Sequence, residues 1–396
     1  MDMFFRRADI GYCSNVHAGE TVAEITQNFS RFMQPVCHHR GLSAMASGLW
    51  ISAAAASELR DEQALANFKQ ALVQSNLKLT SINGFPYGGF HQEKVKDHVY
   101  LPDWSDPARL QYSKNLAAVL ASCLPADHET GAISTLPLGY KAHWNAQKHQ
   151  AAIRHLGELA AYLEQLKQQT GKRILMCLEM EPDCVLESTD ELLDFFVNQL
   201  RPHVSCHEYL AVCYDVCHQA VMFEDAYEAM QRIVDADITI GKIQLSSALQ
   251  AIFTDETCNG ERDESLLSLL AQFCEPKYLH QVKCQDSKGM LKNSFDLFAA
   301  LKNNSLEGNW RIHFHVPINA SHLVHSQLKT TRDDLLRVFD FLRDHLAIRP
   351  FLEVETYSWQ VLPSALRPKS EPELIRGIAA ELRWVEAELQ QRELLV

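Results

Sequence analysis

Carboxylate, imidazole and amide side chains recur where short apolar segments of this sequence end. Burying such groups costs several kcal/mol each unless they are paired or bind a metal. A cation shared by the clusters is the simplest explanation, and carboxylates with an imidazole suit Mn²⁺, Mg²⁺, Co²⁺, Fe²⁺ or Zn²⁺. The four richest clusters are Glu179 with Glu181 in ILMCLEMEPD, Asp215 with His218 in AVCYDVCHQA, His313 with His315 in RIHFHVPIN, and Glu353 with Glu355 in FLEVETYSW.

Each cluster on its own has a plainer explanation. The histidines of the His-x-His pair could be exposed or merely hydrogen-bonded. Glu353 and Glu355 could form salt bridges under a loop, and Asp215 could cap the helix that follows it. The metal hypothesis depends on position, because all four clusters fall at the same end of successive strands, whereas unrelated polar residues would be scattered along them.

Short apolar segments alternate with longer segments of helical period along almost the whole chain, which is typical of a parallel sheet built from βαβ units. The alternation predicts an α/β fold, a (β/α)8 TIM barrel, and such barrels hold their active sites at the carboxyl ends of the strands. Nine strands are predicted for eight places: Ile10–Val16, Ala44–Ile51, Lys78–Asn83, Ala132–Leu136, Ile174–Glu179, Leu210–Asp215, Gly241–Leu245, Arg311–Val316 and Phe351–Glu355. Helices are predicted at Thr21–Cys37, Ala56–Gln74, Pro107–Cys123, Lys148–Thr170, Thr189–Leu200, Met222–Val234, Thr331–His345 and Glu371–Arg392.

One barrel domain, residues 1–396, is expected, with two insertions. The insertion near 84–106 is rich in Gly, Pro and aromatic residues, and the one near 247–309 holds an extra β-like segment, LHQVKC. Long loops on the carboxyl face of a barrel commonly cover the substrate. A surface loop without function is the alternative for the first insertion.

Composition limits the classes of function. The 396 residues are 46% hydrophobic and carry a formal net charge of −13. Such an acidic chain lacks the Lys and Arg clusters that nucleic-acid binding requires, so the expected partner is a small molecule. No apolar segment is long enough for a membrane span and the N-terminal segment has no apolar signal region, so a cytoplasmic protein is expected. Assembly into a homo-oligomer is left open.

Eleven cysteines follow no disulfide spacing. Cys213 and Cys217 with His218 suggest a thiolate metal site, but no second cysteine pair at zinc spacing follows them. We therefore predict buried or free thiols.

At the residues of the four clusters, the chain resembles the xylose isomerase-like TIM-barrel superfamily of sugar isomerases, tagatose- and psicose-type epimerases and endonuclease IV-like enzymes. The resemblance implies metal ligands in the chain order Glu, Asp, His, Glu. The step from Asp215 to His218 is similar to a D-x-x-H motif of the epimerases, whose Asp binds the metal and whose His contacts the substrate. Gln244 stands on the strand where the histidine ligand normally lies, so either His313 or His315 replaces that ligand or Gln244 contributes a carbonyl oxygen.

Six segments carry a narrower resemblance: GYCSNVHAGET, LEMEP, YDVCHQAV, IQLSSAL, HFHVP and LEVETYSW. Together they resemble the EboE-type metabolite traffic proteins, whose operons accompany natural-product pathways. This resemblance implies a barrel that acts on, or accompanies, a secondary-metabolite precursor, and it does not fix a reaction.

The resulting hypothesis is a divalent-metal-dependent isomerase or epimerase of a sugar, cyclitol or related polyol. Glu181 or Glu353 is predicted as the base that removes the proton next to a carbonyl, with His218 as a further catalytic group. The alternatives are a metal-dependent phosphoester hydrolase and a non-catalytic metabolite-binding or traffic protein. The predicted metal ligands are Glu179, Asp215, His315 and Glu355, and the predicted substrate contacts are His17, Asn15, Asn83, Gln244, His280, Lys283 and His313.

Overall fold

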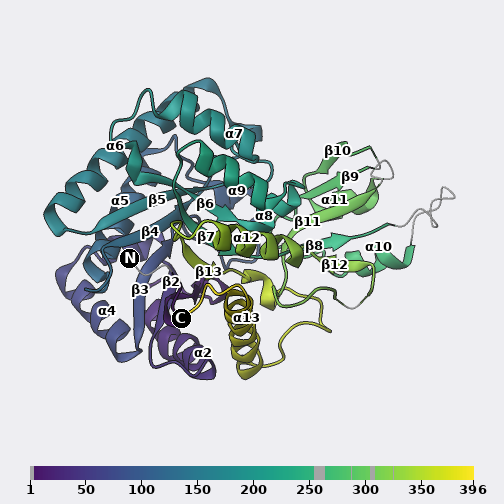
Figure 1. Ribbon diagram of the computed structural model, residues 1–396, viewed down its shortest axis with the longest axis horizontal. Helices are drawn as coiled ribbons and strands as arrows, with labels where there is room; N and C mark the ends of the chain where they lie inside the picture. Colours follow the sequence, from purple (N-terminus) through teal and green to yellow (C-terminus); the bar gives the residue numbers. More distant parts are fainter. Residues whose placement is uncertain (1–3, 254–263, 287, 304–307, 324) are drawn as a thin grey trace.

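The computed structural model describes residues 4–253, 264–286, 288–303, 308–323 and 325–396. Eight parallel strands form one sheet in the order β1-β13-β7-β6-β5-β4-β3-β2, and an isolated parallel bridge between Cys13 and Gly48 joins its two edges. The predicted TIM barrel is therefore confirmed (Figure 1). The strands are β1 (Gly11–Tyr12), β2 (Met45–Trp50), β3 (Leu77–Asn83), β4 (Thr130–Thr135), β5 (Arg173–Glu179), β6 (Leu210–Asp215), β7 (Ile240–Leu245) and β13 (Phe351–Val354).

Helices surround the barrel and bury the outer face of its strands, which explains why the strands are continuous apolar runs rather than alternating ones. No helix among the described residues combines the length and the apolar character that crossing a membrane needs. The helices are α1 (Val22–Asn28), α2 (Gln34–His39), α3 (Ala53–Glu58), α4 (Glu62–Gln74), α5 (Pro107–Cys123), α6 (Ala146–Thr170), α7 (Thr189–Asp194), α8 (Val216–Val221), α9 (Ala226–Asp235), α12 (Arg332–Asp344) and α13 (Glu371–Gln391).

Local signals fix several helix ends. Gly171 follows α6 with a φ of 73°, a left-handed conformation that favours glycine at the end of a helix. Ser188 and Glu191 form a capping box at the start of α7. The predicted helix Met222–Val234 begins only at Ala226, because Asp225 caps it and the short helix α8 precedes it.

A second sheet is inserted between β7 and α12. Its five antiparallel strands run in the order β10-β9-β11-β8-β12, and it lies to the right of the barrel in Figure 1. It has an apolar core of its own that includes Leu249, Leu270, Val282, Trp310 and Phe314. Its elements are β8 (Ala248–Ala251), α10 (Glu264–Ala271), β9 (Val282–Gln285), β10 (Leu291–Ser294), α11 (Leu297–Lys302), β11 (Asn309–His315) and β12 (Leu328–Thr330).

The inserted sheet resolves the surplus of predicted strands. The segment predicted as Arg311–Val316 is β11, which pairs with β8 and β9 instead of entering the barrel. A shift in register between Ile312 and His315 interrupts its pairing with β8. His315 then donates a hydrogen bond to the carbonyl oxygen of Glu355, which directly follows β13. The end of β11 therefore lies over the ends of the barrel strands.

No disulfide joins cysteines in the described part of the chain, where most of them are buried thiols. Cys258 lies outside the described residues, as does part of the predicted insertion 247–309.

Candidate functional site

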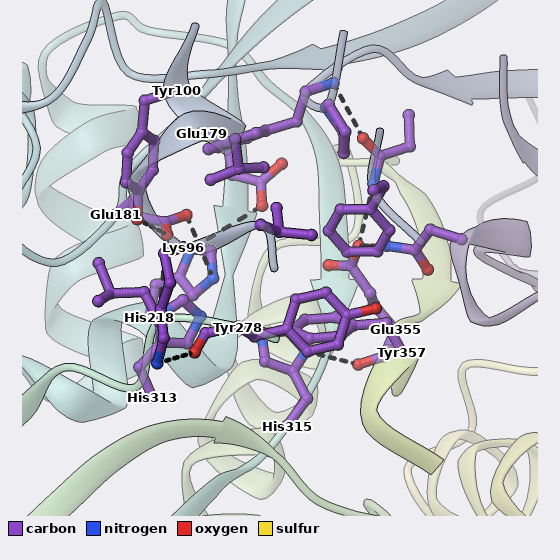
Figure 2. Close-up of a pocket in the computed structure, with 18 residues that line it drawn as sticks. Lys96, Tyr100, Glu179, Glu181, His218, Tyr278, His313, His315, Glu355 and Tyr357 are labelled. Atoms are coloured by element: carbon purple, nitrogen blue, oxygen red, sulfur yellow. Dashed lines mark hydrogen bonds and ion pairs between the residues drawn. The ribbon is translucent and has the colours of Figure 1, made fainter. Parts of the chain in front are cut away.

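A cavity of about 520 Å³, its open mouth included, lies at the carboxyl ends of the barrel strands (Figure 2). It is lined by the strand ends, by the loop after β3, which contains the short helix η4 (Lys96–Tyr100), and by the inserted sheet. Apolar and aromatic residues such as Phe85, Phe90, Tyr278 and Tyr357 form its wall. Its polar floor consists of Asn15, Asn83, Glu179, Glu181, His218, His313, His315 and Glu355.

Three carboxylates from separate strands meet here: Glu179 and Glu355 line the floor, and Asp215 lies next to them outside the lining. Glu179 ends β5, Asp215 ends β6, and Glu355 directly follows β13. Each offers an oxygen within 4.8 Å of the other two, an arrangement that could hold a metal ion. Glu179 Oε2 and Asp215 Oδ2 are buried and have no hydrogen-bond partner among the described residues. Buried polar atoms normally have partners, so these oxygens fit a cation-binding set.

Two amides hold Glu355 in place. Asn15 and Asn83 donate to its Oε1 through their Nδ2 atoms, at 2.7 and 2.9 Å. Burial and the charge of Asp215 raise the pKa of Glu355 to about 8. Burial and then the charges of Glu355 and Asp215 raise the pKa of Glu179 well above its ordinary value. The carboxylates therefore repel one another, and positive charge between them would be stabilised.

One layer further into the barrel lies a buried ion pair. Lys242 Nζ is 2.8 Å from Glu353 Oε2, and neither side chain is more than 4% exposed. Burial alone would lower the pKa of Lys242, but the charges of Glu353 and two cysteines, together with the hydrogen bond to Glu353, outweigh burial and raise that pKa. Gly48 on β2 leaves the space, because a Cβ there would lie 2.0 Å from Glu353 Oε2. Glu353, predicted as a base, is thus neutralised by Lys242 and does not line the cavity.

The inserted sheet adds two imidazoles with fixed tautomers. His315 Nδ1 lies 2.7 Å from the carbonyl oxygen of Glu355, and His313 Nδ1 lies 2.8 Å from Gln281 Oε1. Carbonyl oxygens only accept, so each ring carries its proton on Nδ1 and a lone pair on Nε2. Burial lowers the pKa of His315 to about 4 and that of His313 well below its ordinary value, so both rings are neutral. Neither Nε2 has a partner in the described part of the chain, and metal-binding histidines adopt this state.

His218 lies between Glu179 and His313, with Glu181 beside it (Figure 2). His218 donates from Nδ1 to the carbonyl oxygen of Met180 at 2.7 Å, and its Nε2 lies 3.7 Å from Glu181 Oε2. Burial alone would lower the pKa of His218, but the charges of Asp215 and Glu181 outweigh it and raise that pKa. Burial raises the pKa of Glu181, against the effects of His218 and of the Tyr100 hydroxyl, which donates to Oε1 at 2.7 Å. The pKa values of both groups are therefore raised by their buried, charged surroundings, as is typical of groups that transfer protons at functional sites.

The site offers overlapping sets of metal ligands. The four predicted ligands fall into two of these sets, which share Asp215. The structure therefore brings the predicted ligands together, and their binding of a metal stays a prediction. The sets are Glu179 with Asp215 and Glu355, Asp215 with His218 and His315, Glu181 with His218 and His313, and Cys217 with His313 and His315.

Solved structures of other proteins share this architecture. A xylose isomerase-like TIM-barrel protein from Mycobacterium smegmatis, in complex with magnesium, is 9% identical, with 97% of this chain and 99% of that chain covered and a TM-score of 0.52. A putative xylose isomerase from Rhodospirillum rubrum is 13% identical, with 96% and 98% covered and a TM-score of 0.50. The fold is that of the xylose isomerase-like TIM barrels. No protein-family model matches the chain, and no curated protein matches its sequence.

Two predicted substrate contacts, His17 and His280, have other partners and do not line the cavity. His17 Nε2 lies 2.8 Å from the hydroxyl of Tyr12, beside a second, smaller cavity. His280 uses both ring nitrogens, each at 2.8 Å, on the carbonyl oxygen of His313 and on Glu275 Oε1. Neither residue lines the main cavity.

Lys283 and Gln244 also lie outside the lining of the cavity. Lys283 Nζ binds Asp183 Oδ1 at 2.8 Å and Glu187 Oε2 at 3.1 Å, which attaches the inserted sheet to the loop after β5. Gln244 on β7 is paired in register with Asp215. Both polar atoms of its amide are buried and have no partner among residues that the structure describes.

Tyr100 and Gln281 belong to the site although the sequence analysis did not single them out. Tyr100 lines the cavity and contacts Glu181, and Gln281 contacts His313. The aromatic content of the loop near 84–106 was the signal for Tyr100. Gln281 gave none, because a single amide before a strand forms no pattern.

Proposed function

We propose that this protein is a divalent-cation-dependent isomerase or epimerase of a sugar, cyclitol or related polyol. The observation that carries the proposal is the convergence of buried atoms without partners in the described chain: Glu179 Oε2, Asp215 Oδ2 and His315 Nε2. Carboxylate and imidazole are the ligand types that Mn²⁺, Mg²⁺, Co²⁺, Fe²⁺ and Zn²⁺ accept. The strand ends that carry the carboxylates are also where TIM barrels hold their active sites.

The cation would be held by Glu179, Asp215, Glu355 and His315. A divalent cation bound there supplies polarisation of a substrate carbonyl and neutralises the charge that develops on its oxygen. The raised pKa values of Glu179 and Glu355 support this assignment, because the mutual repulsion behind them is relieved by a cation. Asn15 and Asn83 orient one of the ligands, Glu355.

Glu181 is the carboxylate that we assign to proton transfer. It lines the cavity, accepts from Tyr100 on Oε1 and has Oε2 on the side of His218. Burial raises its pKa toward neutral pH, where a general base works best. Glu353, the other predicted base, is paired with Lys242 away from the cavity, so Glu181 is the better candidate.

The chemistry of the floor favours a substrate rich in hydroxyl groups. Carboxylates only accept hydrogen bonds, and His313 and His315 present lone pairs on Nε2. The amides of Asn15 and Asn83 already donate to Glu355. A ligand at this surface meets mostly hydrogen-bond acceptors, which favours a ligand with several donors, such as the hydroxyl groups of a polyol.

A phosphoester hydrolase is the second candidate. Glu181, His218 and His313 form a ligand set next to the carboxylates, and paired cations are typical of enzymes that cleave phosphoesters. The lysine of the lining argues against it, because Lys96 Nζ already binds Asp296 and the carbonyl oxygen of Tyr278, each at 2.7 Å. Since that lysine is occupied, a phosphate would depend on the cations alone.

Elemental analysis of the purified protein tests the cation, and deuterium exchange tests the reaction. We expect a stoichiometric divalent cation and cation-dependent incorporation of deuterium next to the carbonyl of a ketohexose or a keto-cyclitol probe. Cleavage of p-nitrophenyl phosphate without such exchange would favour the hydrolase.

Tight retention of a probe without either reaction would favour a non-catalytic metabolite-binding protein, as the narrower EboE-type resemblance implies. That resemblance and a secondary-metabolite precursor as substrate stay predictions. A protein that holds no cation after reconstitution would overturn the proposal.

A further inference from the structure

Gln281 connects the inserted sheet to the polar floor through three hydrogen bonds. It directly precedes β9 and is fully buried. Its Nε2 lies 3.0 Å from the carbonyl oxygen of Pro182 and 3.0 Å from the hydroxyl of Tyr100. Its Oε1 lies 2.8 Å from Nδ1 of His313. Both amide hydrogens and the amide oxygen are therefore in use.

The partners of Gln281 fix the direction of every bond in this network. The carbonyl oxygen of Pro182 only accepts, so the amide nitrogen faces it and the amide oxygen faces His313. His313 then carries its proton on Nδ1, which leaves the lone pair of Nε2 free. Tyr100 accepts from the same amide nitrogen, so its own proton goes to Oε1 of Glu181, 2.7 Å away.

We propose that Gln281 is a positioning residue for proton transfer in the cavity. It makes His313 a hydrogen-bond acceptor toward the substrate, and through Tyr100 it occupies Oε1 of Glu181, so that Oε2 is the oxygen that takes up the proton. This inference rests on the proposed function, because it assigns the groups that serve that reaction. It also narrows the substrate class, since a lone pair on His313 recognises a hydroxyl group and repels a carbonyl or phosphate oxygen.

Gln281 is not needed merely to attach the inserted sheet to the barrel, because a neighbouring residue already does this. Two residues further along, Lys283 binds Asp183 and Glu187 and so attaches the same strand to the loop after β5. Gln281 instead contacts His313 and Tyr100, two side chains that line the cavity. An apolar side chain of equal length would fill the same space, so the polar atoms need a reason beyond packing.

Gln281 acts through two hydrogen bonds, one to His313 and the other to Tyr100, which we call the two arms of the network. Two substitutions in the full-length protein separate these arms. Gln281→Met removes the acceptor for His313 and the donor for Tyr100, whereas Gln281→Glu keeps an acceptor for His313 and loses the donor. Nitrogen-15 chemical shifts report which nitrogen of His313 carries the proton, with or without Mg²⁺, and His313→Gln assigns the signal. We expect the Nδ1–H tautomer in the native protein and in Gln281→Glu, and a mixture of tautomers in Gln281→Met.

Tyr100 reports the other arm. In Gln281→Glu its hydroxyl gains a competing carboxylate acceptor and turns away from Glu181. We expect the carbon-13 shift of the Tyr100 ring carbon that bears the hydroxyl to change. We also expect deuterium exchange into the ketohexose probe to fall about tenfold or more in kcat, with little change in KM.

Lys283→Met is the matched control, because it weakens the attachment of the sheet and leaves Gln281 intact. It should not change the His313 tautomer, and an equal change there would reduce Gln281 to a mechanical role and overturn the inference. A native tautomer in Gln281→Met together with a native Tyr100 shift in Gln281→Glu would overturn it as well. The tautomer is read without turnover, so this inference and the proposed function can fail separately.

Discussion

Two groups of side chains in the candidate site differ in origin and in charge. The group called the barrel half consists of the carboxylates Glu179, Asp215 and Glu355 at the ends of parallel strands, and the group called the insert half consists of His313 and His315 at the end of β11. The barrel half is held by geometry common to any TIM barrel. The insert half depends on a sheet that hydrogen-bonds back to the barrel, as His315 does to the backbone of Glu355.

Burial acts on the two halves in opposite directions. It raises the pKa of Glu355 to about 8, together with the charge of Asp215, so the barrel half takes up protons or a cation. It lowers the pKa of His315 to about 4, so the insert half is neutral and ready to accept throughout the neutral range. The barrel half therefore provides the negative charge that a cation would neutralise. The insert half provides neutral imidazole nitrogens whose lone pairs can accept hydrogen bonds or bind the cation.

Removing one charge from the barrel half should have the largest effect. Asp215→Asn keeps an oxygen for the bonds that Oδ1 now accepts from the His218 backbone and the Ser246 hydroxyl, at 2.9 and 2.8 Å, but removes the charge. We expect cation affinity to fall by roughly a thousandfold, since loss of even an outer hydrogen-bond partner costs about 10- to 100-fold. Cation content and calorimetric titration measure this. Asp334→Asn, outside the cavity, is the control, and unchanged cation content in Asp215→Asn would show the ligand assignment to be wrong.

The next largest effect should be on stability, when the buried ammonium group of Lys242 is removed from the layer below the barrel half. Lys242→Met leaves Glu353 buried and unpaired, and we expect a loss of about 3–5 kcal/mol in the free energy of unfolding, measured in urea. Lys283→Met on the insert should cost less, because its partners Asp183 and Glu187 keep more contact with water. Lys242→Met with Glu353→Leu should recover most of the loss. Equal losses for the two lysines would contradict the contrast between the halves.

The pH dependence of stability should separate the halves further. Glu355 has a folded pKa of about 8, above its unfolded value, so its contribution is complete at low pH and is lost as pH rises through 8. Between pH 6.5 and 8 the chelator-treated protein should lose about 2 kcal/mol, seen as a falling melting temperature. With Mn²⁺ the trend should reverse, because deprotonated carboxylates bind the cation. Glu355→Gln should flatten the profile, and a native slope in that variant would assign the effect to another group.

The barrel half could be predicted because its signals are local. Each parallel strand is a buried run with a polar residue at its end, and helix Pro107–Cys123 was predicted to the residue. Lys242 inside the run IGKIQL was also a usable signal, since a lysine within a buried strand requires a partner such as Glu353. The alternation of apolar strand segments and helical segments along the sequence therefore predicts both the fold and the positions of the carboxylates.

His313 and His315 were predicted as site residues, but the sheet that carries them was not, because the placement of β11 depends on long-range contacts. An apolar run such as β11 looks the same in an antiparallel sheet as in a barrel. Past the end of a strand, the periodicity of the sequence no longer indicates which way a side chain points. His17 and His280, for example, were predicted to contact the substrate but bind Tyr12 and Glu275 outside the cavity. The hydrogen bonds that orient His313 come from a residue with no sequence signal, as described for Gln281.

Removing the imidazole of the insert half should have the smallest effect of this series. His315→Gln keeps a polar side chain of similar size but loses the Nε2 lone pair, and we expect cation affinity to fall about 10- to 100-fold, well below the loss in Asp215→Asn. The reason is charge, because three carboxylates of the barrel half still face the cation. Calorimetric titration with Mn²⁺ measures the difference. His17→Gln removes a buried imidazole outside the cavity and should bind like the native protein; a loss in His315→Gln as large as in Asp215→Asn would mean that the inserted sheet, rather than the barrel, dominates the site.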